Sequence, residues 1–580
     1  MYLRMHEYTI YRSILFFFLL LLGGAFAFGA NAQAETQKFF IESSYDLYGR
    51  KQIDATLVRS SPSLYFYVET SWWSARSASE KNDLQIALFE LGQEFQNHIY
   101  PVLTSTFGSE PKPGIDQDER ITVLIHPMIG GAGGYFRSGD VYEILQSPGS
   151  NEKEMVYLSS KYIGSNQAKS FLAHEFTHVI TANQKDLQRH VSEEVWLNEA
   201  RAEYAPTLLG YDDVYSGSNL ERRVEHFLQK PSDSLTDWLN RQEDYGVVHM
   251  FVQYLVDYYG VQILADSLQS SRVGISSLQE ALRKNGVAKD FDKIFEDWTI
   301  AVLVNDCTLG ERYCYKNKHL AHLRVTPTLY VLPSAETIFS TYHTAPLWSG
   351  NWHRMVGGGE NLTIQFKGAN GDAFHVPYVL CDSQNTCSVE FLELDEEHKG
   401  SITFSEFSAK YSSLTLIPSV IGDRLNGAPT ASSFSWEASV QKGAPQGEAA
   451  LVPELLVRIA ELQGQIRQLQ AQLASRGQTQ DSGENQMVSC ASFSANLSVG
   501  ARNEQVRCLQ EFLKSQGPDI YPEGLVTGNF LALTKQAVIR FQEKYAPEIL
   551  VPVGEMKGTG YVGQMTRNKI NQLLGLLVAL

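Results

Sequence analysis

The stretch FLAHEFTHVI, residues 171–180, carries two histidines four positions apart, with a glutamate beside the first. Residues four apart lie on one face of a helix, so His174 and His178 can direct imidazole nitrogens at a single metal ion. This is the ligand spacing of a zinc-binding helix, and Glu175 would lie next to the metal, where it can take a proton from a water. Apolar residues occupy the opposite face, which predicts a helix buried on that side.

A second helical stretch, EEVWLNEARAEYAP at 193–206, supplies the ligand that two histidines leave missing. Glu199 can complete the zinc site, and Glu203 lies one turn further along the same face. From that position Glu203 can hydrogen-bond the far ring nitrogen of a ligand histidine, which is a common way of orienting such imidazoles.

The two stretches together resemble the gluzincin zinc metallopeptidases, the clan that includes thermolysin and the membrane alanyl aminopeptidases. AHEFTH…WLNEARAEYA is most similar to the hyicolysin-like and peptidase-MA-like group of secreted bacterial proteins. The resemblance covers residues 115–305 or so. It implies a zincin-type α+β domain, Zn²⁺ as the cofactor, and Glu199 as the third ligand.

A third segment, YGVVHMFVQYLVDYYG at 245–260, is similar to the gluzincin helix that opens with a catalytic tyrosine. On that resemblance, Tyr245 would donate a hydrogen bond to the oxyanion of the tetrahedral intermediate. Two alternatives stay open: Tyr245 serves only to cap the helix, or His249, one turn along, assists instead.

The absence of an amine-binding segment indicates how the substrate would be cleaved. Related aminopeptidases hold the substrate's free amine with a Gly-x-Met-Glu-Asn segment, and nothing like it occurs here. We therefore expect an endopeptidase with a polypeptide substrate. By the same analogy, EMVYLSS (154–160) would be the edge strand along which an extended substrate lies.

The N-terminus has the pattern of a secretory signal peptide, which we assign to residues 1–32. Arg4 and Arg12 precede the apolar run ILFFFLLLLGGAFAF, and small residues spaced for signal peptidase follow. The alternative is an uncleaved membrane anchor, although the run is near the lower limit for spanning a bilayer.

Export changes the interpretation of the cysteines, because disulfides persist in an oxidising compartment. The six fall into three neighbouring pairs, and the alternative to three short disulfides is six inert thiols. They are Cys307 with Cys314, Cys381 with Cys387, and Cys490 with Cys508.

The fold class that we expect is multidomain. Residues 33–305 read as strands followed by helices, the pattern of an α+β domain. Residues 306–441 switch to short alternating strands with Gly, Asn and Asp turns, which indicates a β-sandwich. A linker at 442–487 contains a heptad stripe at 451–475. This stripe can form a parallel dimeric coiled coil, or it can be a monomeric helical spacer.

Residues 488–580 resemble the peptidoglycan-binding-like three-helix domain attached to many exported bacterial enzymes. The resemblance rests on NLSVGARNEQVRCLQEFL, TKQAVIRFQEKY and GTGYVGQMTRNKI. It implies attachment to the cell wall through this domain, and the alternative is a helical domain that binds nothing.

These features predict a secreted zinc endopeptidase held at the bacterial cell envelope. The formal net charge of −17 argues against nucleic acid as a partner. Two other functions remain open. A peptidoglycan cross-link hydrolase would use the same chemistry, and a non-catalytic envelope scaffold would use zinc only to staple its fold. The scaffold would need a closed fourth ligand, for which His190 is the nearby spare residue.

Overall fold

The structure is a computed structural model. It describes residues 35–333, 336–370, 373–422, 431–441, 493, 496–517, 519–522, 524–551 and 557–578. The predicted signal peptide (1–32), the linker with its coiled segment (442–487) and Cys490 lie outside the described residues. The chain divides into two compact units, Met1–Gln446 and Gly447–Leu580.

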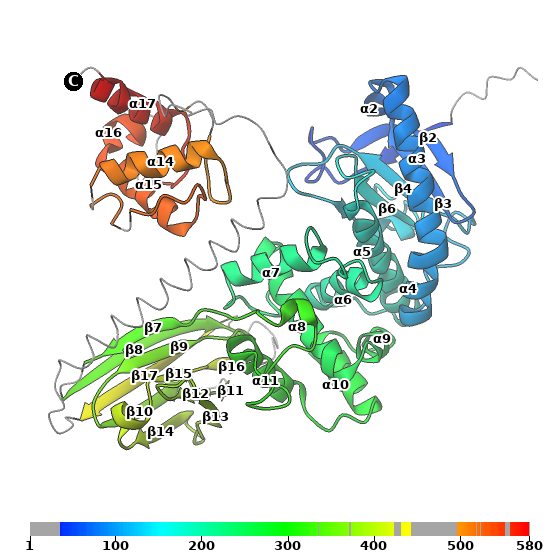
Figure 1. The fold of residues 1–580 in the computed structure, drawn as a ribbon. Helices are drawn as coiled ribbons and strands as arrows, with labels where there is room; N and C mark the ends of the chain where they lie inside the picture. Colours follow the sequence, from blue (N-terminus) through cyan, green and yellow to red (C-terminus); the bar gives the residue numbers. More distant parts are fainter. Residues whose placement is uncertain are drawn as a thin grey trace, which may run out of the picture. The chain divides into compact units, whose positions relative to one another are not determined.

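The first unit begins with a mixed sheet whose strand order is β1-β2-β3-β4-β6-β5 (Figure 1). The strands are β1 (Thr36–Phe40), β2 (Gln52–Ser60), β3 (Leu64–Glu69), β4 (Ile121–His126), β5 (Gly134–Tyr135) and β6 (Met155–Ser159). β3, β4 and β6 run parallel, and the other neighbours are antiparallel. Every residue of β4, ITVLIH, is buried, as a parallel strand covered on both faces requires.

Helices cover one face of this sheet. Phe66, Val123 and Leu158 belong to the large hydrophobic core that contains these helices, whereas Tyr67 and Leu124 face a smaller cluster on the other side. This alternation is the period of two of a β-strand. The elements around the sheet are α2 (Thr70–Ser74), α3 (Ala78–Glu94), η1 (Phe95–Ile99), α4 (Tyr100–Phe107), η2 (Ser138–Val141), α5 (Gln167–Thr181) and η3 (Ala182–Leu187).

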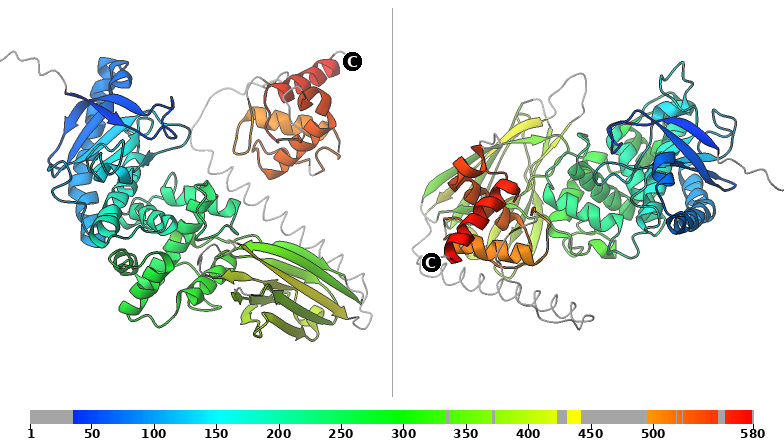
Figure 2. Two further views of the ribbon diagram at one scale, coloured as in Figure 1. Left: turned by 180° about the vertical axis from the view of Figure 1, so that it is seen from behind. Right: turned by 90° about the horizontal axis from the view of Figure 1, so that it is seen from above.

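Further helices lie between the sheet and the β-strands that follow (Figures 1 and 2). They are α6 (Val195–Leu208), α7 (Asn219–Gln229), α8 (Gln242–Tyr259), α9 (Gln262–Leu268), α10 (Gly274–Lys284) and α11 (Phe291–Val304). α5 packs against α6, and α8 packs against both α6 and α7. This bundle places the three segments singled out in the sequence next to one another.

The predicted β-sandwich is confirmed. Its larger sheets have the orders β14-β10-β17-β8 and β13-β12-β15-β9-β7, and β11 pairs with β16. The elements are η4 (Lys318–Leu320), β7 (Thr328–Leu332), β8 (Thr337–Pro346), β9 (His353–Gly357), β10 (Asn361–Gly368), β11 (Ala373–His375), β12 (Pro377–Cys381), β13 (Cys387–Phe391), β14 (Lys399–Phe404), α12 (Phe407–Lys410), β15 (Ser413–Leu416), β16 (Ser419–Ile421) and β17 (Ala431–Gln441). β17 alternates buried and half-buried residues along its length, as a strand with one face in the core should.

The sandwich shares a hydrophobic core with α11. The Trp348 ring meets Phe291 and Phe295 at centroid distances of 5.3 Å, and Trp352 Nε1 donates to the Thr299 carbonyl oxygen at 3.0 Å. Burial of these tryptophans joins the helical part of the first unit to the strands that follow it.

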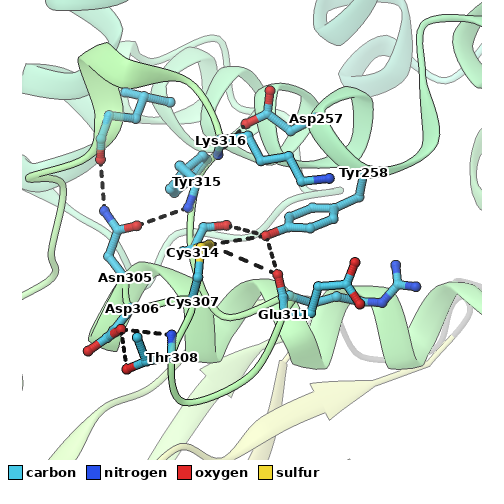
Figure 3. The surroundings of a disulfide bond; sticks show 12 residues. Asp257, Tyr258, Asn305, Asp306, Cys307, Thr308, Glu311, Cys314, Tyr315 and Lys316 are labelled. Atoms are coloured by element: carbon cyan, nitrogen blue, oxygen red, sulfur yellow. Dashed lines mark hydrogen bonds between the residues drawn. A yellow bond between two sulfur atoms is a disulfide. The ribbon is translucent and has the colours of Figure 1, made fainter.

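Two of the predicted disulfides form, Cys307–Cys314 and Cys381–Cys387. Cys508 is disulfide-bonded as well. The loop closed by Cys307–Cys314 lies on α8 (Figure 3), where the Tyr258 hydroxyl donates to the Cys314 carbonyl oxygen at 2.9 Å. The disulfide closes the loop, and Tyr258 fastens it to the C-terminal half of the helix that begins near Tyr245.

The second unit has its own core, built on α14 (Glu504–Ser515), α15 (Ala532–Lys544), α16 (Ala546–Ile549) and α17 (Gln564–Val578). Two buried glutamines perform equivalent tasks in it. Gln510 donates to Thr534 Oγ1 at 2.8 Å, and Gln542 donates to Thr566 Oγ1 at 2.9 Å. Gln510 also accepts the main-chain N–H groups of Thr527 and Gly528, and Gln542 accepts that of Gly560. The repeated LQ and FQ of the sequence therefore hold the loops that precede α15 and α17.

No helix among the described residues has the length and apolarity needed to cross a membrane.

A buried histidine, His353, makes the sandwich sensitive to acid. The rings of His353 and His343 lie 4.3 Å apart, and the Tyr330 hydroxyl contacts both. Burial, together with the smaller effect of the neighbouring His343, lowers the pKa of His353 to about 3. The unfolded chain takes up a proton near pH 6.5, whereas the folded chain does not do so until about pH 3. The contribution of neutral His353 to the free energy of unfolding is therefore complete above pH 6.5 and decreases as the pH drops toward 3.

We predict that His353→Gln reduces this acid sensitivity. One proton changes the free energy of unfolding by about 1.4 kcal/mol per pH unit. Between pH 6.5 and 5 the wild type should thus lose up to about 2 kcal/mol more than the variant. Urea titrations at both pH values, with hydrogen exchange of the β9 and β17 amides to locate the change, measure the difference. Equal losses in the two proteins would contradict the assignment.

Candidate metal centre

Helix α5 presents both histidines of the motif to one point. Its opposite side is packed into the core through Leu172, Phe176 and Val179. The Nε2 atoms of His174 and His178 face each other at 3.2 Å. The i, i+4 spacing therefore produces the converging pair of imidazoles that the sequence predicts.

Helix α6 brings a carboxylate to the same point. Glu199 Oε2 lies 3.3 Å from Nε2 of His174 and 3.7 Å from Nε2 of His178. A tetrahedral zinc ion with bonds of about 2.0–2.2 Å separates its ligand atoms by about 3.3–3.6 Å. Glu199 Oε2 is buried and receives no hydrogen bond. The three side chains thus fit a metal ion. In the described part of the chain, they are the cluster of metal-ligating side chains whose ligand atoms lie close enough together to hold one.

A polar side chain at Nδ1, on the side of the ring away from the other ligands, orients each histidine. His178 Nδ1 lies 3.0 Å from Asn198 Oδ1, and His174 Nδ1 lies 3.4 Å from Glu203 Oε1. Nδ1 carries the proton in these contacts, which leaves Nε2 free to bind a metal. Glu203 therefore lies where the sequence predicts it. Asn198 was not singled out, although it directly precedes Glu199 in the W-L-N-E stretch.

Glu203 is itself held by its neighbours. Arg223 of α7 donates to both of its oxygens, at 2.5 and 2.8 Å, and Asn219 donates to Oε2 at 2.8 Å. Burial alone would raise the pKa of Glu203, but Arg223 and His249 hold it well below its usual range. Glu203 is therefore an ionised carboxylate, available to accept from His174.

Glu175 lies beside the three ligands in a cavity of about 340 Å³. Burial raises the pKa of Glu175 to about 8. His174 opposes this rise, and the charges of Glu199 and Glu203 add to it. Several carboxylates thus lie close together in a buried space. A divalent cation bound there would offset the repulsion among them.

Tyr245 lines the same cavity from the N-terminal turn of α8. Its hydroxyl donates to Asn240 Oδ1 at 3.1 Å, and its ring meets Trp238 at 4.7 Å. Burial, together with Glu199 and Tyr45, raises its pKa, so the hydroxyl keeps its proton. Tyr245 therefore lies close enough to the ligands to act on a substrate there.

The assisting role considered for His249 does not fit the structure. His249 is fully buried and lies behind Glu203, with its Nδ1 3.2 Å from Glu203 Oε2. Its Nε2 faces Gln253 at 3.1 Å. The side chain does not line the cavity, and it serves as a partner of Glu203.

The strand predicted to form the sheet edge also needs correction. β6, which contains most of EMVYLSS, is covered by β5, where Gly134 pairs with Leu158 and Tyr135 with Tyr157. The glycine-rich loop after β4 folds back to provide this outer strand. A Cβ on Gly134 would lie 2.9 Å from Glu175 Cγ, so only glycine lets the outer strand pass this close to the glutamate.

The fourth ligand that a purely structural zinc site would need is not found among the described residues. His190 is exposed, and it does not belong to the group that could hold a metal. Two imidazoles, one carboxylate and an adjacent cavity form instead an open metal site, the arrangement that catalytic zinc proteins use.

Comparison with known proteins agrees with a metalloprotease. No protein-family model matches the chain. Among curated proteins, the neutral metalloprotease ShpI of Staphylococcus hyicus is 28% identical over 221 residues, which cover 34% of this chain. The match spans 48% of that protein, about half of its length. The chain is thus a distant homologue of a neutral metalloprotease.

Solved structures add little to this. The pre-peptidase C-terminal domain of a Bacillus anthracis collagenase is 13% identical, and the match covers 20% of this chain and 97% of that one. The Yersinia pseudotuberculosis-derived mitogen is 10% identical, with coverage of 20% and 93%. Both comparisons give a TM-score of 0.14 and support no conclusion about function.

We predict that the purified protein binds one zinc ion through these three side chains. Ala at His174, His178 or Glu199 should remove a ligand and empty the site, because three protein ligands leave no reserve. Metal analysis after dialysis against a weak chelator measures the loss. His190→Ala is the matched control and should keep its zinc. Full zinc in each ligand variant would refute the assignment.

Proposed function

We propose that this chain is a secreted zinc-dependent endopeptidase. The observation that carries the proposal is the convergence of three ligand atoms beside a buried glutamate in one open cavity. Distant homology to a neutral metalloprotease supports the same chemistry. A zinc ion at this site would polarise the scissile carbonyl and acidify a water molecule.

The side chains around the site would divide the remaining work. Glu175 takes the proton of the attacking water and passes it to the leaving amine. It lines the same cavity as the three ligands, where a carboxylate can accept and return this proton. Tyr245 keeps its proton and can donate a hydrogen bond to the oxygen that becomes negative.

An extended peptide would bind along the outer edge of β5. Strand addition satisfies the main-chain groups of a substrate without fixing its sequence. Because Gly134 brings β5 against Glu175, a peptide on this edge would pass over the metal ligands. An internal stretch of a polypeptide fits such an edge, which favours an endopeptidase over an enzyme that trims chain ends.

We predict that Glu175→Gln abolishes most hydrolysis but keeps zinc and fold. The amide matches the carboxylate in shape and cannot take the proton, so kcat should fall by about 10²–10⁴. Tyr245→Phe should lower kcat by about 10²–10³ as the loss of one oxyanion donor. Initial rates on casein, at equal zinc content, measure both effects.

The matched control for Glu175→Gln is Glu225→Gln, an identical change at an exposed position of α7. It should cleave like the wild type. A Glu175→Gln protein that cleaves as fast as the wild type would rule out the mechanism. Zinc-loaded proteins that cleave neither casein nor isolated sacculi would favour the envelope scaffold, and cleavage of sacculi alone would favour a cross-link hydrolase.

We further propose that the second unit holds the enzyme at the cell wall. Its helical core and glutamine-fastened loops support a stable module with a defined surface. The full chain should sediment with purified peptidoglycan, and a chain ending at Gln446 should stay in the supernatant. Equal sedimentation of the two proteins would contradict this attachment.

A further inference from the structure

Tyr45 is a further tyrosine at the metal centre. It lies in the turn between β1 and β2, yet it lines the same cavity as Glu175, Glu199 and Tyr245. Burial raises the pKa of Tyr45, a hydrogen bond with Asn240 opposes the rise, and the charges of Glu175 and Glu199 add to it. Tyr45 therefore keeps its proton close to the two carboxylates.

The ring of Tyr45 is fixed by a stack of tyrosines. It lies on Tyr135 at a centroid distance of 4.8 Å and an interplanar angle of 18°. Tyr135 lies in turn on Tyr157, at 4.2 Å and 10°. Tyr135 and Tyr157 are buried strand residues of β5 and β6. The position of the Tyr45 hydroxyl is thus tied to the strand that passes over Glu175.

The backbone around Tyr45 is fixed as firmly as its ring. Ile129 N–H donates to the Tyr45 carbonyl oxygen at 2.9 Å, which pins the turn to the loop after β4. The next residue, Asp46, is buried and accepts from the Arg50 side chain and from the N–H groups of Tyr48 and Arg50. A buried carboxylate with this many donors makes a rigid support. The turn therefore presents Tyr45 in one orientation.

Asn240 links the two cavity tyrosines. Its Oδ1 accepts the hydroxyl proton of Tyr245 at 3.1 Å. Its φ of 57° is left-handed, and Asp244 holds this conformation by accepting from the N–H groups of Leu239 and Arg241 at 2.8 and 2.9 Å. Asn240 also hydrogen-bonds the Tyr45 hydroxyl and lowers its pKa, which is the effect of a donor to the phenol oxygen. The proton of Tyr45 is not used in such a contact and can be donated into the cavity.

We propose that Tyr45 is a second catalytic tyrosine, which donates a hydrogen bond to the substrate carbonyl oxygen as that oxygen gains negative charge. The inference rests on the proposed peptidase function. One hydroxyl comes from the turn between β1 and β2 and the other from α8, and Asn240 hydrogen-bonds both.

The test compares Tyr45→Phe with the wild type at equal zinc content. Phenylalanine keeps the stack on Tyr135 and removes only the hydroxyl, so fold and KM should stay unchanged. kcat should fall by about 10–10³, the range up to the loss of a full oxyanion donor. Tyr48→Phe is the matched control, since Tyr48 belongs to the same turn and is 66% exposed. It should cleave like the wild type.

A second measurement separates a catalytic role from a structural one. A phosphonamidate peptide mimics the tetrahedral oxyanion and should lose affinity for Tyr45→Phe by the same factor as kcat/KM, whereas a product peptide should bind equally well. If kcat and phosphonamidate affinity were both unchanged in Tyr45→Phe, the inference about Tyr45 would be overturned and the proposed peptidase function would still stand. A wild type that cleaves no peptide would overturn the proposed function, and the inference with it.

Discussion

The packing of α5 against α6 is the contact on which the metal centre depends. Each helix contributes ligands that are useless alone, two imidazoles from α5 and one carboxylate from α6. These ligands converge only if the two helices have one particular separation and one particular rotation about their axes. Core side chains help to fix both: Phe176 is buried on the face of α5 turned away from the two histidines, and Trp196 is buried in the first turn of α6. A close-packed core transmits small shifts, so substitutions there would move the ligands as well.

This contact buries several charges, and the surrounding helices compensate for them. Glu203 lies at the centre, between His174 of α5, Arg223 of α7 and His249 of α8. Removing one partner of such a network leaves an unpaired buried charge, which is costly. The same network that orients a metal ligand therefore also ties four helices together, and stability and site geometry cannot be changed separately here.

The parts of the site that the sequence predicts are those set by local helical geometry. His174 and His178 are readable because a spacing of four means one face, and the same rule relates Glu203 to Glu199. Tyr45 could not be found in this way. It comes from a turn far from the motif, and only the sheet that carries Tyr135 brings it to the cavity. The outer strand β5 was missed for a similar reason, since two residues after a glycine-rich loop give no strand pattern.

The fold class could also be predicted from the local sequence pattern. The change from helical to alternating periodicity after residue 305 marks the β-sandwich, because the two patterns bury different faces. The shared core of Trp348, Trp352 and α11 could not be anticipated. Tryptophans in a strand-rich segment do not reveal which neighbour they cover.

The metal-free site is electrostatically unfavourable, and this links metal binding to the fold. Three carboxylates lie close together, those of the buried Glu175 and Glu203 and of the half-buried Glu199, and Arg223 is bonded to only one of them. Repulsion among them acts directly on the contact between α5 and α6. A divalent cation placed between the ligands would reverse the sign of that interaction, so binding of the metal stabilises the helix pair that creates its site. The firmly supported β5 and the turn of Tyr45 lie outside this pair, and they keep the substrate side of the cavity in place whether or not a metal is bound.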